Sequence, residues 1–152
     1  PDLRRQVARC AEHVAAAREH GGRVVAGGRA RRDLGGHYFE PTVVDLDGTA
    51  NPLAQEETFG PVVSVLGYRD ADHAVELAND TVYGLSGAVY GPADEALAVA
   101  RRVRSGTVFV NGGYIGAFAS SGGRRHSGDG RERGREGIRA YQQAKHVTAV
   151  SA

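Results

Sequence analysis

The strongest candidate for chemistry in this chain of 152 residues is a carboxylate pair followed by an aromatic residue. Glu56 and Glu57 precede Thr58, Phe59 and a Gly-Pro pair. Adjacent side chains of an extended segment point in opposite directions, so only Glu57 shares a face with Phe59. A carboxylate there can accept hydrogen bonds from a sugar diol while the ring packs on a flat heterocycle. The same residues also fit a solvated acidic turn before a core phenylalanine, and physical chemistry alone favours that plainer interpretation.

The only cysteine is a second candidate for chemistry. His13 follows Cys10 by about one helical turn, and such a pair can generate a thiolate nucleophile. However, Cys10 falls on the apolar face of an expected helix, where free cysteines are usually buried. We therefore interpret Cys10 as structural and expect no catalytic residue in this chain. The histidines lack metal-ligand spacing, so no metal site is predicted. A lone cysteine also fits a reducing cytoplasm.

An arginine cluster near the C-terminus leaves a different function open. Glycine-rich and arginine-rich segments can bind nucleic acid through phosphate contacts. The residues concerned are Arg124, Arg125, Arg131, Arg133 and Arg135. Acidic residues lie among them and the net charge of the chain is only +1, so we expect no nucleic-acid partner. The chain has no apolar run long enough for a membrane span and no signal-peptide pattern at its start, so a membrane location is not expected.

The elements that must position these residues follow from periodicity and from glycine and proline positions. We expect helices over 1–19, 70–79, 92–105 and 136–144, strands over 23–26, 37–46, 62–66, 85–90, 107–110 and 146–150, and irregular segments over 47–54 and 112–135. Strands alternating with helices of about ten residues predict an α/β fold with a largely parallel sheet and flanking helices. Long loops such as 112–135 tend to be functional or mobile.

Five segments, in order along the chain, resemble those of one enzyme family. They are Gly36–Val43 (Gly-x-x-x-x-Pro-Thr-Val), Glu56–Pro61 (Glu-Glu-x-Phe-Gly-Pro), Ala78–Leu85 (Ala-Asn-x-x-x-Tyr-Gly-Leu), Gly106–Asn111 (Gly-Thr-Val-x-Val-Asn) and Ser127–Glu132 (Ser-Gly-x-Gly-Arg-Glu). Together they resemble the C-terminal part of the NAD(P)-dependent aldehyde dehydrogenase superfamily. The resemblance covers essentially the whole chain.

The resemblance implies a role for four residues. Glu57 corresponds to the glutamate that binds the nicotinamide ribose hydroxyls, and Phe59 to the phenylalanine beside the nicotinamide end of NAD or NADP. Asn111 would lie near the substrate tunnel. Ser121 stands where the family commonly has the phenylalanine of Pro-Phe-Gly-Gly, which implies a wider or more polar substrate pocket. The implied organisation is a partial catalytic domain over 1–145 and a subunit-interface strand over 146–152.

The resemblance also implies that essential parts lie elsewhere. The family's nucleophilic cysteine, general-base glutamate and oxyanion-stabilising asparagine precede the matched region, and no Gly-x-Gly-x-x-Gly turn for the cofactor is present. We therefore expect oxidation of an aldehyde to a carboxylic acid only when the chain is joined to, or complemented by, an upstream dehydrogenase half. The expected assembly is that complex or a homo-oligomer. The alternative is a non-catalytic module that pairs with a full-length homologue through its strand edges.

Overall fold

In the computed structural model, which describes residues 2–150, the longest helix is α1 (Leu3–Glu19). The side chain of Asp2 caps its N-terminus by accepting a hydrogen bond from the backbone of Arg4. Cys10, Val14 and Ala17 are the buried residues of this helix, at the spacing of one helical face. This confirms the first predicted helix and its apolar face.

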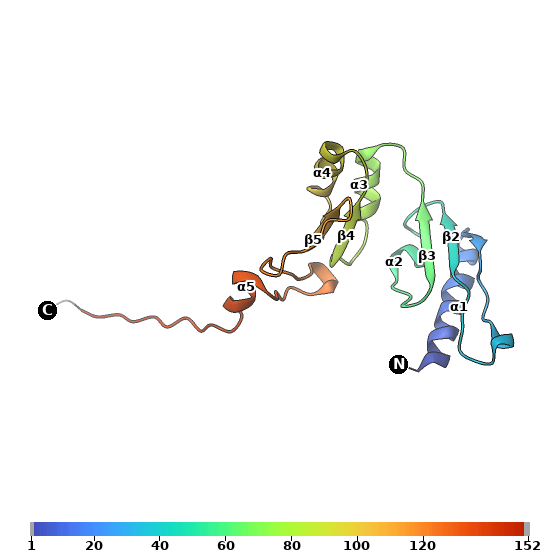
Figure 1. The fold of residues 1–152 in the computed structure, drawn as a ribbon, viewed down its shortest axis with the longest axis horizontal. Helices are drawn as coiled ribbons and strands as arrows, with labels where there is room; N and C mark the ends of the chain where they lie inside the picture. The colour runs from blue at the N-terminus through green and yellow to red at the C-terminus, as the bar shows by residue number, and fades with distance from the viewer. Residues whose placement is uncertain (1, 151–152) are drawn as a thin grey trace. The chain divides into compact units, whose positions relative to one another are not determined.

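The face of α1 that carries these residues packs on a three-stranded sheet of order β1-β2-β3 (Figure 1). The strands are β1 (Arg23–Ala26), β2 (Thr42–Leu46) and β3 (Val62–Leu66). β2 pairs with β1 antiparallel and with β3 parallel. Alternate residues of β2 are buried, and Val44 and Leu46 join Ala17 in the core.

A short helix, α2 (Pro52–Gln55), lies inside the segment 47–54 that we expected to be irregular. The Asn51-Pro52 pair provided a helix-start signal that the sequence analysis did not use. Asn51 is buried, and its side-chain oxygen accepts from the Leu53 amide at 3.1 Å. Its amide nitrogen donates to the carbonyl of Ala17 at 2.9 Å. Asn51 therefore begins α2 and satisfies a carbonyl at the end of α1.

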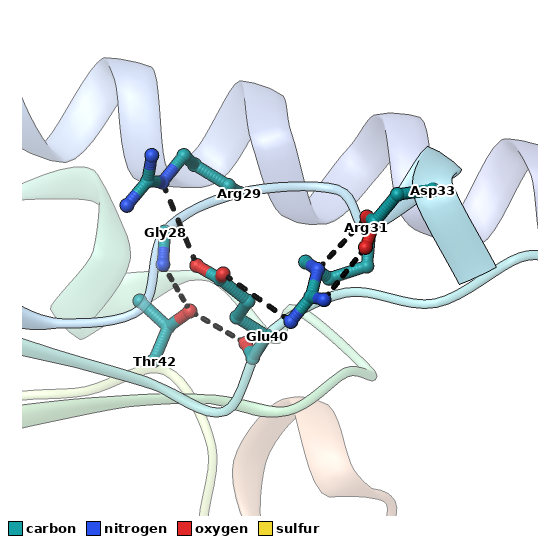
Figure 2. A network of polar contacts seen from close by, with 6 residues as sticks. All are labelled: Gly28, Arg29, Arg31, Asp33, Glu40 and Thr42. Atoms are coloured by element: carbon teal, nitrogen blue, oxygen red, sulfur yellow. Dashed lines mark hydrogen bonds and ion pairs between the residues drawn. The ribbon is translucent and has the colours of Figure 1, made fainter.

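A polar network orders the connection between β1 and β2 (Figure 2). The buried hydroxyl of Thr42 accepts from the Gly28 amide at 2.8 Å and donates to the Glu40 carbonyl at 2.7 Å. The Glu40 carboxylate faces Arg29 at 3.8 Å and Arg31 at 4.0 Å. Arg31 also pairs with Asp33 at 2.7 Å, so each charge in this cluster has an opposite neighbour and the network stabilises the connection.

Helix α3 (Ala71–Asn79) follows β3, with Asp70 as its N-cap as predicted. The chain then divides into two units, Pro1–Thr81 and Val82–Ala152. The second unit contains β4 (Ser86–Val89), α4 (Ala93–Ala100) and β5 (Thr107–Val110), in which β4 and β5 are parallel and α4 contacts both. The α/β class with mostly parallel pairing is therefore confirmed, although the described strands form two sheets.

Three expected elements of the second unit differ from the structure. α4 ends at Ala100, because the amides of Arg102 and Val103 bond three residues back and tighten the chain. The last helix, α5, spans Gly134–Arg139 rather than 136–144. Residues 142–150 contain neither helix nor strand, so the strand expected over 146–150 is not formed in the single chain. A strand needs a hydrogen-bonding neighbour, and residues 151 and 152 lie outside the described part.

Candidate functional site

The predicted cofactor residues lie on the segment 56–60, between α2 and β3. Thr58 is buried, whereas Glu57 and Phe59 on either side of it are exposed. Phe59 is 71% exposed, so it is not the core phenylalanine of the plainer interpretation. The segment therefore presents the carboxylates of Glu56 and Glu57 and one aromatic ring to the surroundings while Thr58 secures it.

The backbone of two predicted site residues is left-handed. Phe59 has φ 54° and Asn111 has φ 50°; the other non-glycine residues of this kind among those described are Arg125 and Arg133. This conformation is unfavourable for residues with a Cβ, especially a bulky aromatic, and is found where the surroundings impose it. Such strain is enriched at functional sites, which is consistent with the predicted roles of Phe59 and Asn111.

Three polar side chains of α1 contact the segment 56–60; we call Gln6, Arg9 and His13 the α1 clamp. Gln6 Nε2 donates to the Thr58 carbonyl at 2.7 Å and also to the Phe59 carbonyl. Arg9 Nη2 donates to the Glu57 carbonyl at 2.7 Å. His13 Nδ1 is hydrogen-bonded to Thr58 Oγ1 at 3.3 Å. Sequence analysis missed these contacts, because nothing in a helical pattern states which loop its polar side chains will meet.

Cys10 contacts the same segment and is buried, as expected for a structural residue. A Cβ placed on Gly60 would lie 2.2 Å from Cys10 Sγ, so the thiol packs directly against that glycine. Burial raises the pKa of the Cys10 thiol. A raised thiol pKa and a buried sulfur are the opposite of what a nucleophile needs. The geometry therefore favours a packing role.

The predicted substrate-pocket residue Asn111 follows β5 in the second unit. Its side-chain oxygen accepts from the Gly91 amide at 3.0 Å, and its side-chain nitrogen donates to the Gly91 carbonyl at 3.0 Å. The amide thus forms a closed pair with the backbone between β4 and α4. Through these two hydrogen bonds Asn111 fixes the point at which the loop after β5 begins.

The other predicted pocket residue, Ser121, lies in the long loop, which is more ordered than its composition suggests. Ser121 and Glu132 exchange two backbone hydrogen bonds, of 2.9 and 2.8 Å. The guanidinium of Arg131 donates to the carbonyls of Gly123 at 2.7 Å, Asp129 at 3.0 Å and Gly130 at 2.8 Å. Arg131 is therefore an internal support of this loop, which weakens the nucleic-acid interpretation of the arginine cluster.

The structure places Glu57 and Phe59 in the first unit and Asn111 and Ser121 in the second. Across residues 2–150 there is no group of three or more histidine, cysteine, aspartate or glutamate side chains arranged to hold a metal ion. Within the same described range, no helix is long and apolar enough to cross a membrane.

Comparison with known proteins identifies the family. The model of the aldehyde dehydrogenase family matches residues 3–147. The chain belongs to this family. A Mycobacterium tuberculosis protein named "Putative succinate-semialdehyde dehydrogenase (NADP(+)) 2" is 43% identical over 91% of this chain. The geranial dehydrogenase of Castellaniella defragrans is 47% identical over 82% of it.

Solved structures of family members agree with the fold. The betaine aldehyde dehydrogenase of Staphylococcus aureus, solved in complex with NAD+, superposes on 94% of this chain with a TM-score of 0.86 and 38% identity. The chain spans 29% of that enzyme and 28% of the mycobacterial relative. This aldehyde dehydrogenase chain thus corresponds to less than a third of the length of such relatives.

Proposed function

We propose that this chain supplies the nicotinamide-ribose contact of an NAD(P)-dependent enzyme that oxidises an aldehyde to a carboxylic acid. The observation that carries the proposal is the exposed pair Glu57 and Phe59, held on a segment whose backbone carbonyls are anchored to α1. Membership of the family supports this assignment, since the segment has the family's Glu-Glu-x-Phe-Gly-Pro pattern.

The residues present fit one end of a dinucleotide. The Glu57 carboxylate is an acceptor for a vicinal diol, and the exposed Phe59 ring offers a flat apolar surface for a heterocycle. When bound, NAD(P)+ supplies the hydride acceptor of the oxidation. Glu57 would orient the ribose, and Phe59 would limit the positions that the nicotinamide ring can take.

The chemical step itself requires groups that we propose lie in an upstream dehydrogenase half, either on the same polypeptide or on a complementing one. Cys10 does not provide a nucleophile, because its sulfur packs against Gly60 and its pKa is raised. We therefore propose that the 152-residue chain alone does not oxidise aldehydes. Asn111 and Ser121 would contribute to the substrate pocket through the loop between them, with Ser121 making that pocket wider or more polar.

The test compares the isolated chain with a chimera. In the chimera, this chain replaces the matching part of the mycobacterial relative, and NAD(P)H formation is followed by absorbance with a panel of aldehydes. We expect no turnover by the chain alone, turnover by the chimera, and a raised KM for NAD(P)+ in the chimera with Glu57→Gln. A chimera that unfolds on heating as cooperatively as the relative, yet binds neither NAD+ nor NADP+, would refute the proposal. So would turnover by the chain alone that survives Glu57→Gln but is lost with Cys10→Ser.

A second candidate function is a non-catalytic module that pairs with a full-length homologue. The observation in its favour is that Val63 and Val65 on one face of β3 are 53% and 48% exposed. Such a face is a common feature of surfaces that associate. Co-purification with a co-expressed full-length relative, weakened by Val63→Thr/Val65→Thr, would support this candidate. A chain that stays monomeric by light scattering in the presence of that relative would exclude it.

Assembly and location complete the proposal. We propose that residues 146–152 form an interface strand only when they meet a neighbouring subunit, in a homo-oligomer or in the complex with the upstream half. A cytoplasmic location is proposed from the single cysteine.

A further inference from the structure

The α1 clamp holds the backbone of the segment 56–60 and leaves its two predicted cofactor side chains free. Three successive carbonyls, those of Glu57, Thr58 and Phe59, each accept a hydrogen bond from a side chain of α1. Such consecutive carbonyls of an irregular segment otherwise require water or strand partners. Here one helix satisfies all three, so the conformation of the segment depends on α1.

The spacing of the α1 clamp explains how one helix can follow an extended segment. Gln6, Arg9 and His13 are three and four residues apart and therefore lie on one side of α1. His13 adds a contact at the start of the segment, because its Nε2 lies 3.9 Å from the Glu56 carboxylate. Cys10, between them, supports Gly60 at the other end. The segment is thus contacted by α1 at each of its five residues.

The α1 clamp also accounts for the strained backbone of Phe59. A left-handed backbone is unfavourable for phenylalanine relative to its ordinary conformations. Gln6 donates to the carbonyls of Thr58 and Phe59, which belong to the two peptides that flank the Cα of Phe59, and this fixes the direction of the chain there. Removing this support would let the segment relax and turn the Phe59 ring.

From this geometry we infer that Gln6, Arg9 and His13 are positioning residues, which set the orientation of Glu57 and Phe59 toward the cofactor through the backbone. This inference rests on the proposed function, in which those two side chains contact the nicotinamide ribose. It assigns to α1 a role in cofactor affinity that requires no contact between these three side chains and the nucleotide. The residue best suited to a test is Arg9, since it is exposed and its replacement leaves the core intact.

The first experiment measures the segment without any cofactor. The chain has no tryptophan, so Phe59→Trp introduces a single tryptophan that can be excited apart from the tyrosines and serves as the reporter. With Arg9→Met, which keeps much of the stem but removes the donor, we expect a larger amplitude of nanosecond motion in the anisotropy decay. Arg9→Lys, which keeps a donor, should restore much of the order. Arg5→Met is the matched control, because Arg5 is 90% exposed and pairs only with Asp2 among the described contacts that involve it.

The second experiment measures cofactor use in the chimera, with Phe59 intact. Loss of one charge-assisted hydrogen bond should raise the KM for NAD(P)+ by about 3- to 10-fold in Arg9→Met, with kcat changed by less than about 2-fold. Arg9→Lys should recover most of that affinity and Arg5→Met should match the unsubstituted chimera. A merely structural role would lower the melting temperature without this split between KM and kcat.

The outcomes separate the two ideas. If Arg9→Met leaves both the anisotropy decay and the KM unchanged, the positioning inference is wrong while the proposed function stands. If the unsubstituted, folded chimera binds no nucleotide, the proposed function is wrong, and the positioning inference, which rests on it, is overturned as well. If the reporter becomes mobile and the KM rises, with rescue by lysine, both are supported.

Discussion

The contact between Cys10 and Gly60 allows a quantitative test of how α1 supports the candidate site. The perturbation is Gly60→Ala, which adds a methyl group whose ideal position lies 2.2 Å from Cys10 Sγ. Gly60 does not have a left-handed backbone, so alanine meets no conformational barrier there. The whole cost must therefore come from the steric overlap with the thiol.

The magnitude follows from overpacking. Adding a methyl group to a filled site costs about 1–3 kcal/mol in the free energy of unfolding. In a Cys10→Ala background the nearest atom of residue 10 is its Cβ, at 3.9 Å, which is ordinary van der Waals contact. Cys10→Ala by itself should cost about 1 kcal/mol, for the lost burial of the sulfur. The double variant should then be about as stable as Cys10→Ala alone, with a coupling of about 1–3 kcal/mol.

The assay is urea unfolding followed by far-ultraviolet circular dichroism, to which the 17 residues of α1 contribute strongly. A loss of 2 kcal/mol shifts the midpoint by about 1 M for a domain of this size. Gly67→Ala is the control, because a Cβ at Gly67 meets nothing within 4 Å. If the two single losses add to within about 0.5 kcal/mol in the double variant, the sulfur does not occupy the space assigned to it and the packing role of Cys10 is wrong.

Two further predictions concern the other elements that support the site. Asn111→Ala should destabilise the second unit by about 1–2 kcal/mol and speed hydrogen exchange of the Gly91 amide, because two hydrogen bonds are lost and the left-handed backbone becomes more strained. Asn111→Gly should speed that exchange equally but cost less stability. An unchanged exchange rate of the Gly91 amide in both variants would contradict the closed pair between Asn111 and Gly91. The backbone hydrogen bond from His73 holds the pKa of the Asp70 carboxyl below its usual range. A depressed pKa contributes stability that is fully present above the unfolded pKa and is lost as the pH falls through the folded pKa. Asp70→Ala should therefore lower the thermal midpoint at about pH 7, and the difference should shrink as the pH falls below about 4 toward the depressed pKa of Asp70; a difference that stays constant as the pH falls would disprove the capping role.

Local patterns were sufficient for most elements. The β-branched run of Val62–Leu66 and the Asp70 N-cap predicted β3 and α3, because propensity and capping act within a few residues. The same holds for the apolar face of α1. The Asn51-Pro52 start of α2 was also present in the sequence as a local signal, although it was not used. At the ends of α4 and α5, where the prediction failed, the boundary depended on single turns of backbone hydrogen bonding. The strand expected over 37–46 is formed only over Thr42–Leu46, and the strand expected over 146–150 is not formed, because a strand needs a neighbour that the local pattern does not specify.

The features of the candidate site were likewise determined in part by the sequence and in part by the tertiary structure. The sequence by itself determined the family and the candidate pair Glu57 and Phe59, because their residue types and order are carried by the chain. Only the tertiary structure decided that Phe59 is exposed on a left-handed backbone, that Asn111 is committed to Gly91, and that the Cys10 thiol is buried against Gly60. These features depend on contacts between segments that lie 20 to 50 residues apart, for which a helical or strand period contains no information. The carboxylate pair noticed first in the sequence thus gains its orientation from α1, a helix nearly fifty residues away in the chain.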